Sequence, residues 1–204
     1  MAYAHARGVF LGSANLKGAN FQDADLRNSI LWEANLEEAS LWSSNLENAN
    51  LWGANLDGSN LGYANLDGAD LGRSSLKGAN LLNTRLNDVD LRLANLERAN
   101  LSSASLRRGF LWEANLKGAN LRGANLQEAS LSLVNFDEAS FKNAYLLGAS
   151  LRGSFLEKAY DLTEEQLDIA KLCRTTLPAH IDLDPNRDCE ELDVDPITGN
   201  FIGL

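Results

Sequence analysis

The chain has 204 residues, of which 45% are hydrophobic, and it carries a formal net charge of −10. A chain of this length forms one domain, or one domain with an appendage. The negative charge disfavours non-specific binding to nucleic acid and to anionic membranes, and there is no run of about 18 apolar residues that would cross a bilayer. We therefore expect no nucleic-acid partner and no membrane insertion.

Residues 1–8 are predicted to be a short lead-in. The first ten residues contain no apolar stretch of the length that a signal peptide requires. Ala2, Ala4 and Ala6 nevertheless have the A-x-A spacing of a signal-peptide cleavage site. Two interpretations stay open: the remnant of a removed signal behind an added Met1, or an ordinary start made of small residues.

Residues 9–160 contain a five-residue repeat. From Leu11 to Leu156, every fifth residue is Leu or Phe at all thirty positions. The residue two places earlier is small, most often Ala, and the residue between the two is usually Asn, Asp or Ser. The unit is therefore A-N-L-x-x, as in Ala14-Asn15-Leu16. We call the Leu or Phe of each unit the central residue.

A period of five fits neither an α-helix nor a β-strand, and it requires a chain that turns by a fixed amount in each unit. The A-(N/D)-L-x-x tandem resembles the pentapeptide-repeat family over residues 9–158. The resemblance implies an all-β solenoid, a right-handed quadrilateral β-helix with four units per coil. Thirty units would then make about seven and a half coils of twenty residues, with central residues and small residues pointing inward.

The position after the central residue holds all four tryptophans of the chain: Trp32, Trp42, Trp52 and Trp112. In coils of twenty residues, Trp32 and Trp52 are expected to be stacked neighbours, with Trp112 farther along the same side and Trp42 on the opposite side. Exposed aromatic side chains either anchor a binding partner or form a ladder that stiffens the coil. The four tryptophans are the candidate binding residues.

Residues 161–204 are predicted to form a capping helix and an acidic loop tail. Thr163 followed by Gln166 is a capping box, which predicts a short helix that ends at about Cys173. Three prolines farther along break the chain into loops. We expect this segment to cover the last coil, because an open strand edge favours aggregation.

The two cysteines of the chain, Cys173 and Cys189, both lie in this tail. Two cysteines in one small subdomain suggest a disulfide, which would contribute about 3 kcal/mol through loop closure. A disulfide would place the protein in an oxidising compartment, such as a periplasm or a thylakoid lumen, whereas two free thiols would fit a cytoplasmic protein. Some cyanobacterial pentapeptide-repeat proteins are similar in having a helical, cysteine-containing C-terminal cap, which favours the lumenal interpretation.

The sequence offers little material for catalysis. His5 and His180 are the only histidines, and nucleophile-elbow, zinc-protease and phosphate-loop motifs are absent, so we expect neither enzyme activity nor a cofactor. Acidic and amide residues alternate from Asp182 to Glu190, and Asp193 stands at the twelfth position, a spacing that resembles an EF-hand loop. Arg187 stands where such a loop needs glycine, and we therefore predict a solvated acidic loop without a metal.

The repeat is compatible with three hypotheses about function. The first is a non-enzymatic scaffold or protein-binding module with an unknown partner. The alternative that the resemblance implies is a DNA-mimicking protein that interacts with topoisomerase or gyrase. Residues 9–158 carry 17 acidic and 14 basic side chains, a net charge of −3, which is too little for mimicry. The third is an assembly protein, either a monomer or a dimer joined end to end through the N-terminal coil.

Overall fold

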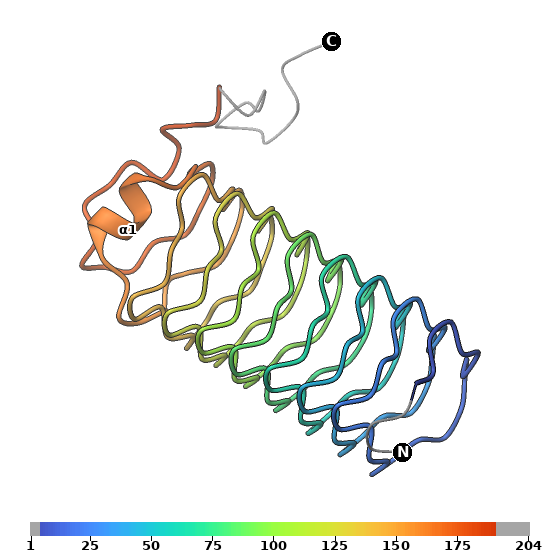
Figure 1. Cartoon of the computed structure of the whole chain (residues 1–204). Coiled ribbons are helices and arrows are strands. Elements are labelled where there is room, and N and C mark those ends of the chain that lie inside the picture. The colour runs from blue at the N-terminus through green and yellow to red at the C-terminus, as the bar shows by residue number, and fades with distance from the viewer. Residues whose placement is uncertain (1–4, 191–204) are drawn as a thin grey trace.

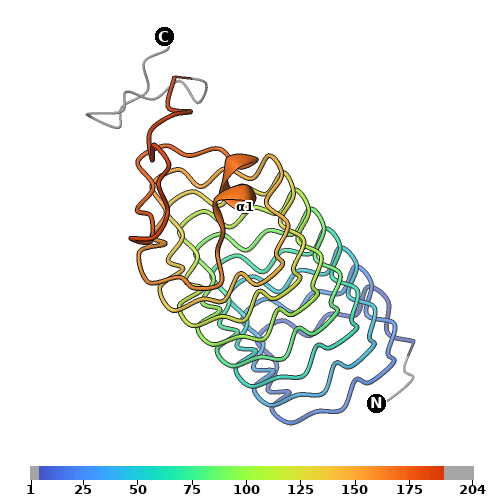
Figure 2. The same cartoon turned by 90° about the vertical axis from the view of Figure 1, so that its left-hand side faces the viewer.

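The computed structural model describes residues 5–190, which form a long four-sided coil with one short helix at its C-terminal end (Figures 1 and 2). The helix, α1, spans Glu164–Asp168. The coil is the right-handed quadrilateral β-helix that the family resemblance implies. Ala2 and Ala4 of the A-x-A spacing and Asp193 of the acidic series lie outside the described residues.

Successive coils are joined by parallel β-bridges between residues twenty positions apart. The series runs without a gap from the bridge between His5 and Asp25 to the bridge between Ser140 and Tyr160. Two kinds of backbone hydrogen bond join neighbouring coils. In the first, an amide donates to the following coil, as from Leu31 to the carbonyl of Asn50 at 2.7 Å, and in the second an amide donates to the preceding coil, as from Asn50 to the carbonyl of Ser29 at 2.9 Å. Because each side of the coil is so short, the structure has isolated bridges where a flatter fold would have extended strands.

Each unit turns a corner directly after its central residue. The carbonyl of Leu51 accepts a hydrogen bond from the amide of Ala54 at 3.0 Å, and Gly53 between them has a φ of 65° in the left-handed region. The polar residue before the central residue supports the corner: Asn55 Oδ1 accepts the amide of Asp57 at 3.1 Å. This local bond to the backbone is the role expected for asparagine in tight turns.

The core is a single column of side chains inside the coil. Central residues from Phe21 to Leu156 are buried, and so are the small residues two places before them from Ala24 onward. Leu81, in the middle of the coil, is only 1% exposed. Fully burying a side chain of this size contributes roughly 1.5–3 kcal/mol, so the stability of the coil depends on these repeated apolar positions.

The bridge series begins at His5, four residues before the predicted start of the repeat. Ala6 takes the central position there, and its amide donates to the carbonyl of Asp25 at 2.8 Å. A small residue at the central position removed the Leu or Phe signal from this unit, although the backbone follows the same path. Ala6 packs against the core but stays partly exposed.

Helix α1 is shorter than the sequence predicts, because the coil resumes directly after it. Its N-terminus is the predicted capping box, in which Thr163 and Gln166 satisfy each other's backbone amides. The helix ends at Asp168 and not near Cys173. Lys171 then bridges to Ser150, and Thr176 bridges to Phe155, which places both of them 21 residues from their partners. Ala170 and Leu172 are buried in the positions of a small residue and a central residue.

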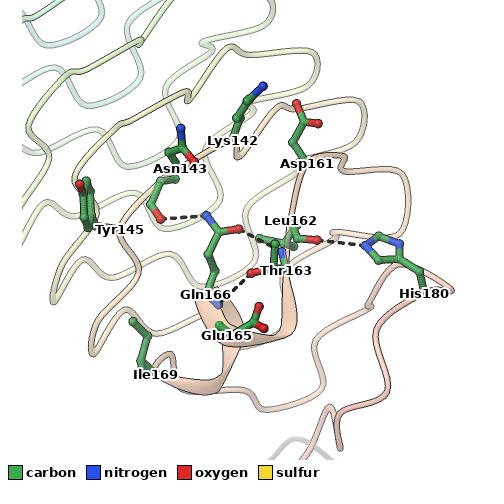
Figure 3. Close-up of a pocket in the computed structure, with 11 residues that line it drawn as sticks. Lys142, Asn143, Tyr145, Asp161, Leu162, Thr163, Glu165, Gln166, Ile169 and His180 are labelled. Atoms are coloured by element: carbon green, nitrogen blue, oxygen red, sulfur yellow. Dashed lines mark hydrogen bonds between the residues drawn. The ribbon is translucent and has the colours of Figure 1, made fainter.

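The coil is joined to α1 by one side chain in particular. Elsewhere, the carbonyl of a small residue accepts the amide 21 positions later, as when Ala14 accepts from Asn35. At Ala144 the helix diverts the backbone, and the side-chain amide of Gln166 donates to the carbonyl of Ala144 at 2.9 Å (Figure 3). The same amide also donates to the carbonyl of Phe141 at 2.9 Å. Gln166 therefore replaces a missing backbone donor.

Residues 177–190 fold back over the end of the coil. Arg187 donates to the carbonyls of Leu167 at 2.7 Å and Ala170 at 2.8 Å, and so satisfies the end of α1. The amide of Asp188 donates to Leu172 at 3.0 Å. Within residues 5–190 there is no helix with the length and apolarity that a membrane crossing requires.

Candidate functional site

One side of the coil carries three of the four tryptophans. The residues that follow the central residue on this side recur once per coil, and we call this column the tryptophan face. It consists of Gly12, Trp32, Trp52, Gly72, Arg92, Trp112, Ser132, Arg152 and Cys173. Cys173 belongs to the column because the one-residue shift after α1 puts it where Arg152 stands in the coil before, and its carbonyl accepts the amide of Gly153 at 2.8 Å.

Glycines on this face determine how the indoles lie. A Cβ added to Gly12 would come within 2.7 Å of Nε1 of Trp32, so that indole covers Gly12 in the coil before it. A Cβ on Gly72 would lie 3.2 Å from Cδ1 of Trp52, so that indole leans toward the coil after it. The two indoles turn away from each other, and the expected stacking of Trp32 on Trp52 is not present. Trp32 meets the edge of Phe10 instead, with ring centroids 6.5 Å apart.

Trp42 lies on the opposite side of the coil, as the spacing predicts. Its indole covers Gly62 one coil later and packs against Tyr63, with ring centroids 4.8 Å apart. Trp42 is therefore half-buried, as is Trp32. Trp52 and Trp112 are each 41% exposed, and they are the candidate binding residues that the structure leaves most open to a partner.

The tryptophan face contains two hollows, which meet at Trp112. The first, of about 290 Å³, lies between Trp52 and Trp112 and includes Gly72 and Arg92 in its lining. The second, of about 490 Å³, lies between Trp112 and the end of the coil. Its lining includes Trp112, Leu133, Arg152, Gly153, Phe155 and Arg174. Hollows of this size that are bordered by aromatic side chains are typical of binding surfaces.

Acidic side chains near the first hollow are paired with arginines. Nε of Arg92 donates to Asp90 at 2.9 Å. Burial acts to raise the pKa of Asp90, but the hydrogen bonds from Arg92 outweigh it, and the pKa lies below the usual value. Near the N-terminus, a side-chain hydrogen bond from Arg27 lowers the pKa of Asp25 to about 2. The lining of the first hollow has two acidic residues, Asp70 and Asp90, and two arginines, Arg73 and Arg92, so its net charge is small.

The tryptophan face ends in a disulfide bond. Cys173 and Cys189 are bonded, with their Cα atoms 4.7 Å apart, and both are buried. The predicted disulfide is therefore present in the structure. Sequence reasoning did not place it on the tryptophan face, because the one-residue shift at α1 hides the alignment of Cys173 with Trp112. The sequence did contain a signal of how the indoles lie, because a glycine stands one coil away from each of Trp32, Trp42 and Trp52.

A third hollow, of about 760 Å³, lies beside α1 (Figure 3). His180 is at its edge, where Nε2 donates to the carbonyl of Leu162 at 3.0 Å. His5 lies at the other end of the coil, so the two histidines are not brought together. The polar groups around this hollow hold α1 and the adjoining loop to the coil.

The acidic series that begins at Asp182 is used in internal hydrogen bonds. Asp184 accepts the amide of Asn186 at 2.8 Å, and Asn186 accepts the amide of Arg174 at 3.0 Å. Asp188 accepts the amide of Leu172 at 2.7 Å. Across residues 5–190, no group of three His, Cys, Asp or Glu side chains is arranged to hold a metal ion.

Comparison with known proteins gives the family. A search of curated proteins found no match. Among solved structures, HetL, a pentapeptide repeat protein involved in heterocyst differentiation regulation from the cyanobacterium Nostoc sp. strain PCC 7120, is 36% identical over 88% of this chain and 83% of its own, with a TM-score of 0.49. Rfr23 from the cyanobacterium Cyanothece 51142 is 29% identical over 60% of this chain and 63% of its own, with a TM-score of 0.36.

A pentapeptide repeat protein from the Arabidopsis thaliana thylakoid lumen is 26% identical over 64% of this chain and 70% of its own, with a TM-score of 0.20. The sequence model described as pentapeptide repeats matches this chain in 8 copies, over residues 1–32, 34–73, 54–92, 94–132 and 114–153. These matches cover more than half of the chain, and with the five-residue repeat they show that it belongs to the pentapeptide-repeat family.

Proposed function

We propose that the protein is a non-enzymatic binding module that holds a protein partner along the tryptophan face. The observation that carries this proposal is the pair Trp52 and Trp112, each 41% exposed, at the two borders of a hollow that includes Gly72. Exposed tryptophans beside a hollow are the residues that most often anchor a protein partner. The other sides of the coil are convex, which suits a scaffold better than an active site.

A capture experiment with matched variants tests the proposal. The parent protein, Trp52→Ala with Trp112→Ala, and Trp42→Ala are immobilised and exposed to native extract. We expect a partner that the parent and Trp42→Ala retain and that the double variant loses, since Trp42 lies on the opposite side. A partner that survives the double variant, or that Trp42→Ala loses equally, would count against the tryptophan face.

The charge arrangement supports a protein partner over DNA mimicry. Nη2 of Arg108 donates to Asp88 at 2.7 Å, and the guanidinium of Arg85 pairs with Asp67. Acids on the coil are thus neutralised locally, whereas a mimic of duplex DNA needs a dense anionic surface. A gyrase supercoiling assay with a quinolone tests this choice, and protection of gyrase would favour the mimic.

We further propose that residues 161–190 cap a coil of about seven and a half turns, counted from thirty units at four per turn. Gln166, Lys171 and Thr176 support this proposal, because they bond to backbone groups of the last units that would otherwise face solvent. A capped end is expected to resist association with other chains.

The disulfide supports a place in an oxidising compartment, such as a periplasm or a thylakoid lumen. Thiol titration of the folded protein, isolated without reductant, is the direct test. We expect no reactive thiol, and two free thiols per chain would favour the cytoplasm.

The N-terminal end supports a dimer joined end to end. Leu11 and Leu16 are only partly buried there, and the amides of Phe10, Asn15 and Asn20 have no partner within residues 5–190. A second copy meeting this end would bury both features. Light scattering over a range of concentrations is expected to show the dimer, and a strict monomer at high concentration would rule it out.

A further inference from the structure

Aspartate stands directly before the central residue in three units of the coil: Asp25, Asp70 and Asp90. In two of these units an arginine follows two positions later and binds the aspartate through its guanidinium. Arg27 donates to Asp25 from Nε at 2.8 Å and from Nη2 at 2.6 Å. Arg92 donates to Asp90 from Nε at 2.9 Å and from Nη2 at 2.5 Å. A guanidinium placed on the carboxylate is therefore the arrangement that this position of the coil supports.

Asp70 has no such arginine, because Gly72 stands two positions later. Oδ1 of Asp70 accepts the amide of Gly72 at 2.9 Å, which holds the carboxylate in the lining of the first hollow. Asp70 is only partly exposed, and within residues 5–190 it takes part in no ion pair. A carboxylate that is partly withdrawn from water gains more from a cationic partner than a fully exposed one does. The place that a guanidinium occupies beside Asp25 and Asp90 is open beside Asp70.

The indole of Trp52 lies at the edge of this open place. A Cβ on Gly72 would be 3.2 Å from Oδ1 of Asp70 and 3.2 Å from Cδ1 of Trp52. A side chain that enters above Gly72 would therefore meet the carboxylate and the indole together. The guanidinium group of arginine suits both, because its planar fork of N–H groups pairs with a carboxylate and it also stacks on aromatic rings.

The arginines of this chain leave the place beside Asp70 open. Arg92 lines the first hollow, but its guanidinium is held by Asp90. Arg73 lines it as well, but it stands at a corner of the coil with a φ of 57°, and its exposed side chain makes no ion pair within the described part of the chain. Because solvent screens the charge of an exposed arginine, Arg73 opposes a second guanidinium only weakly. An arginine that pairs with Asp70 therefore has to come from another molecule.

We propose that the protein partner of the tryptophan face inserts an arginine side chain into the first hollow, where its guanidinium pairs with Asp70 and stacks on Trp52. Arginine is enriched at protein interfaces and among the residues that dominate their binding energy, as tryptophan is. The inference rests on the proposed function for the existence of the partner, but the arginine site itself can be measured without one.

An NMR titration with a small arginine compound tests the site in the full chain. The probe is N-acetyl-arginine amide, and its uncharged isostere N-acetyl-citrulline amide is the control compound. The indole N–H signals of the four tryptophans are assigned by replacing each tryptophan in turn with Phe. We expect the arginine compound to shift the signal of Trp52 to saturation and to leave that of Trp42, on the opposite side, unchanged. The citrulline compound should produce no saturable shift.

Asp70→Asn is the variant that removes the charge and keeps the coil. Asparagine is the most frequent residue at this position of the repeat, and Asn60 accepts the amide of Gly62 as Asp70 accepts that of Gly72. We expect the variant to bind the arginine compound about tenfold more weakly or not at all. Asp23→Asn, which changes an exposed aspartate on the opposite side of the coil, is the matched control and should bind as the parent does.

The inference is overturned if the arginine compound gives no saturable shift, if the citrulline compound gives the same shift, or if Asp70→Asn binds as tightly as Asp23→Asn. Its failure is distinguishable from failure of the proposed function. A chain that captures a partner through Trp52 and Trp112 but does not bind the arginine compound would keep the proposed function and overturn this inference. A chain that binds the compound through Asp70 but captures no protein would keep the arginine site and overturn the proposed function.

Discussion

At the N-terminal end of the coil, the core residues Leu11 and Leu16 are partly exposed, and the outward-facing amides of Asn15 and Asn20 have no partner within the described part of the chain. At the C-terminal end, the amide of Lys171 donates to Ala149 at 2.8 Å, and the side chain of Gln166 takes over where α1 diverts the backbone. Both ends come from the same repeat. They differ because, within residues 5–190, a helix and a loop fold back onto the coil at the C-terminal end and not at the N-terminal end.

The comparison shows that a five-residue repeat specifies the middle of such a molecule better than its ends. A coil in the middle receives backbone hydrogen bonds from both neighbours, whereas a terminal coil has only one neighbour. The C-terminal end adds specific side chains, a helix and a disulfide to replace the missing neighbour. The open end is therefore expected to be the weaker part of the structure.

The largest effect is expected in the middle of the coil. Leu81→Ala would leave a cavity in a site that is 1% exposed and should reduce the free energy of unfolding by about 2–5 kcal/mol. Leu11→Ala at the open end should cost clearly less, because Leu11 is already partly exposed. Urea unfolding of both variants measures the difference. Equal losses would show that the open end is packed as tightly as the middle.

Loss of the disulfide should weaken the C-terminal end alone. Its cysteines are 16 residues apart, and a loop of that size contributes about 3 kcal/mol to the free energy of unfolding. Thermal unfolding of Cys173→Ser with Cys189→Ser should show this loss, and reductant should have no further effect on the double variant. A reduced parent protein that unfolds at the temperature of the oxidised one would contradict the stabilising role.

Gln166→Ala should destabilise the junction between α1 and the coil. The substitution removes the donor to the carbonyl of Ala144, and leaving such a buried group unpaired costs about 1–3 kcal/mol. The carbonyl of Phe141 keeps its hydrogen bond from the amide of Ala144. Gln127→Ala is the control, because its side chain makes no hydrogen bond within residues 5–190 and should change little. A smaller loss in Gln166→Ala than in the control would argue against the replacement of a backbone donor.

The smallest effect is a dependence on pH near the open end. The hydrogen bond from Arg27 lowers the pKa of Asp25 from 3.8 to about 2 in the folded protein. The stabilisation is therefore complete above the unfolded pKa and is lost as the pH falls from about 4 to about 2. Asp25→Asn should remove this part of the acid dependence in urea titrations, and Asp23→Asn on the neighbouring exposed turn should keep it. Equal acid profiles for Asp25→Asn and the parent would contradict the assignment.

Much of the fold is predictable from the sequence, because the central residue recurs without interruption from Leu11 to Leu156. That regularity predicts the coil, the inward positions and the separation of Trp42 from the other tryptophans. The return to the coil at Lys171 was not predicted. Its units, Ala170 to Arg174 and Thr175 to Ala179, are one residue out of phase and come after a helix signal.

The candidate site was predictable in position but not in orientation. A tryptophan after the central residue is at the surface in any coil, but the indoles of Trp32 and Trp52 each turn toward the neighbouring coil that has a glycine. Trp32 lies over Gly12 in the coil before it, and Trp52 lies against Gly72 in the coil after it. The hollows depend on these directions and on Leu133, which lies against Gly153. Such contacts depend on side-chain packing between coils, which a one-dimensional pattern does not contain.

Amide hydrogen exchange resolved by residue tests the difference between the two ends most directly. The amides of Phe10, Asn15 and Asn20 should exchange at nearly the rate of an unstructured chain, while those of Lys171 and Thr176 should be protected by their bonds to Ala149 and Ser154. Equal protection at the two ends, or slower exchange at the N-terminal end, would contradict a coil that is open at its start and closed at its finish.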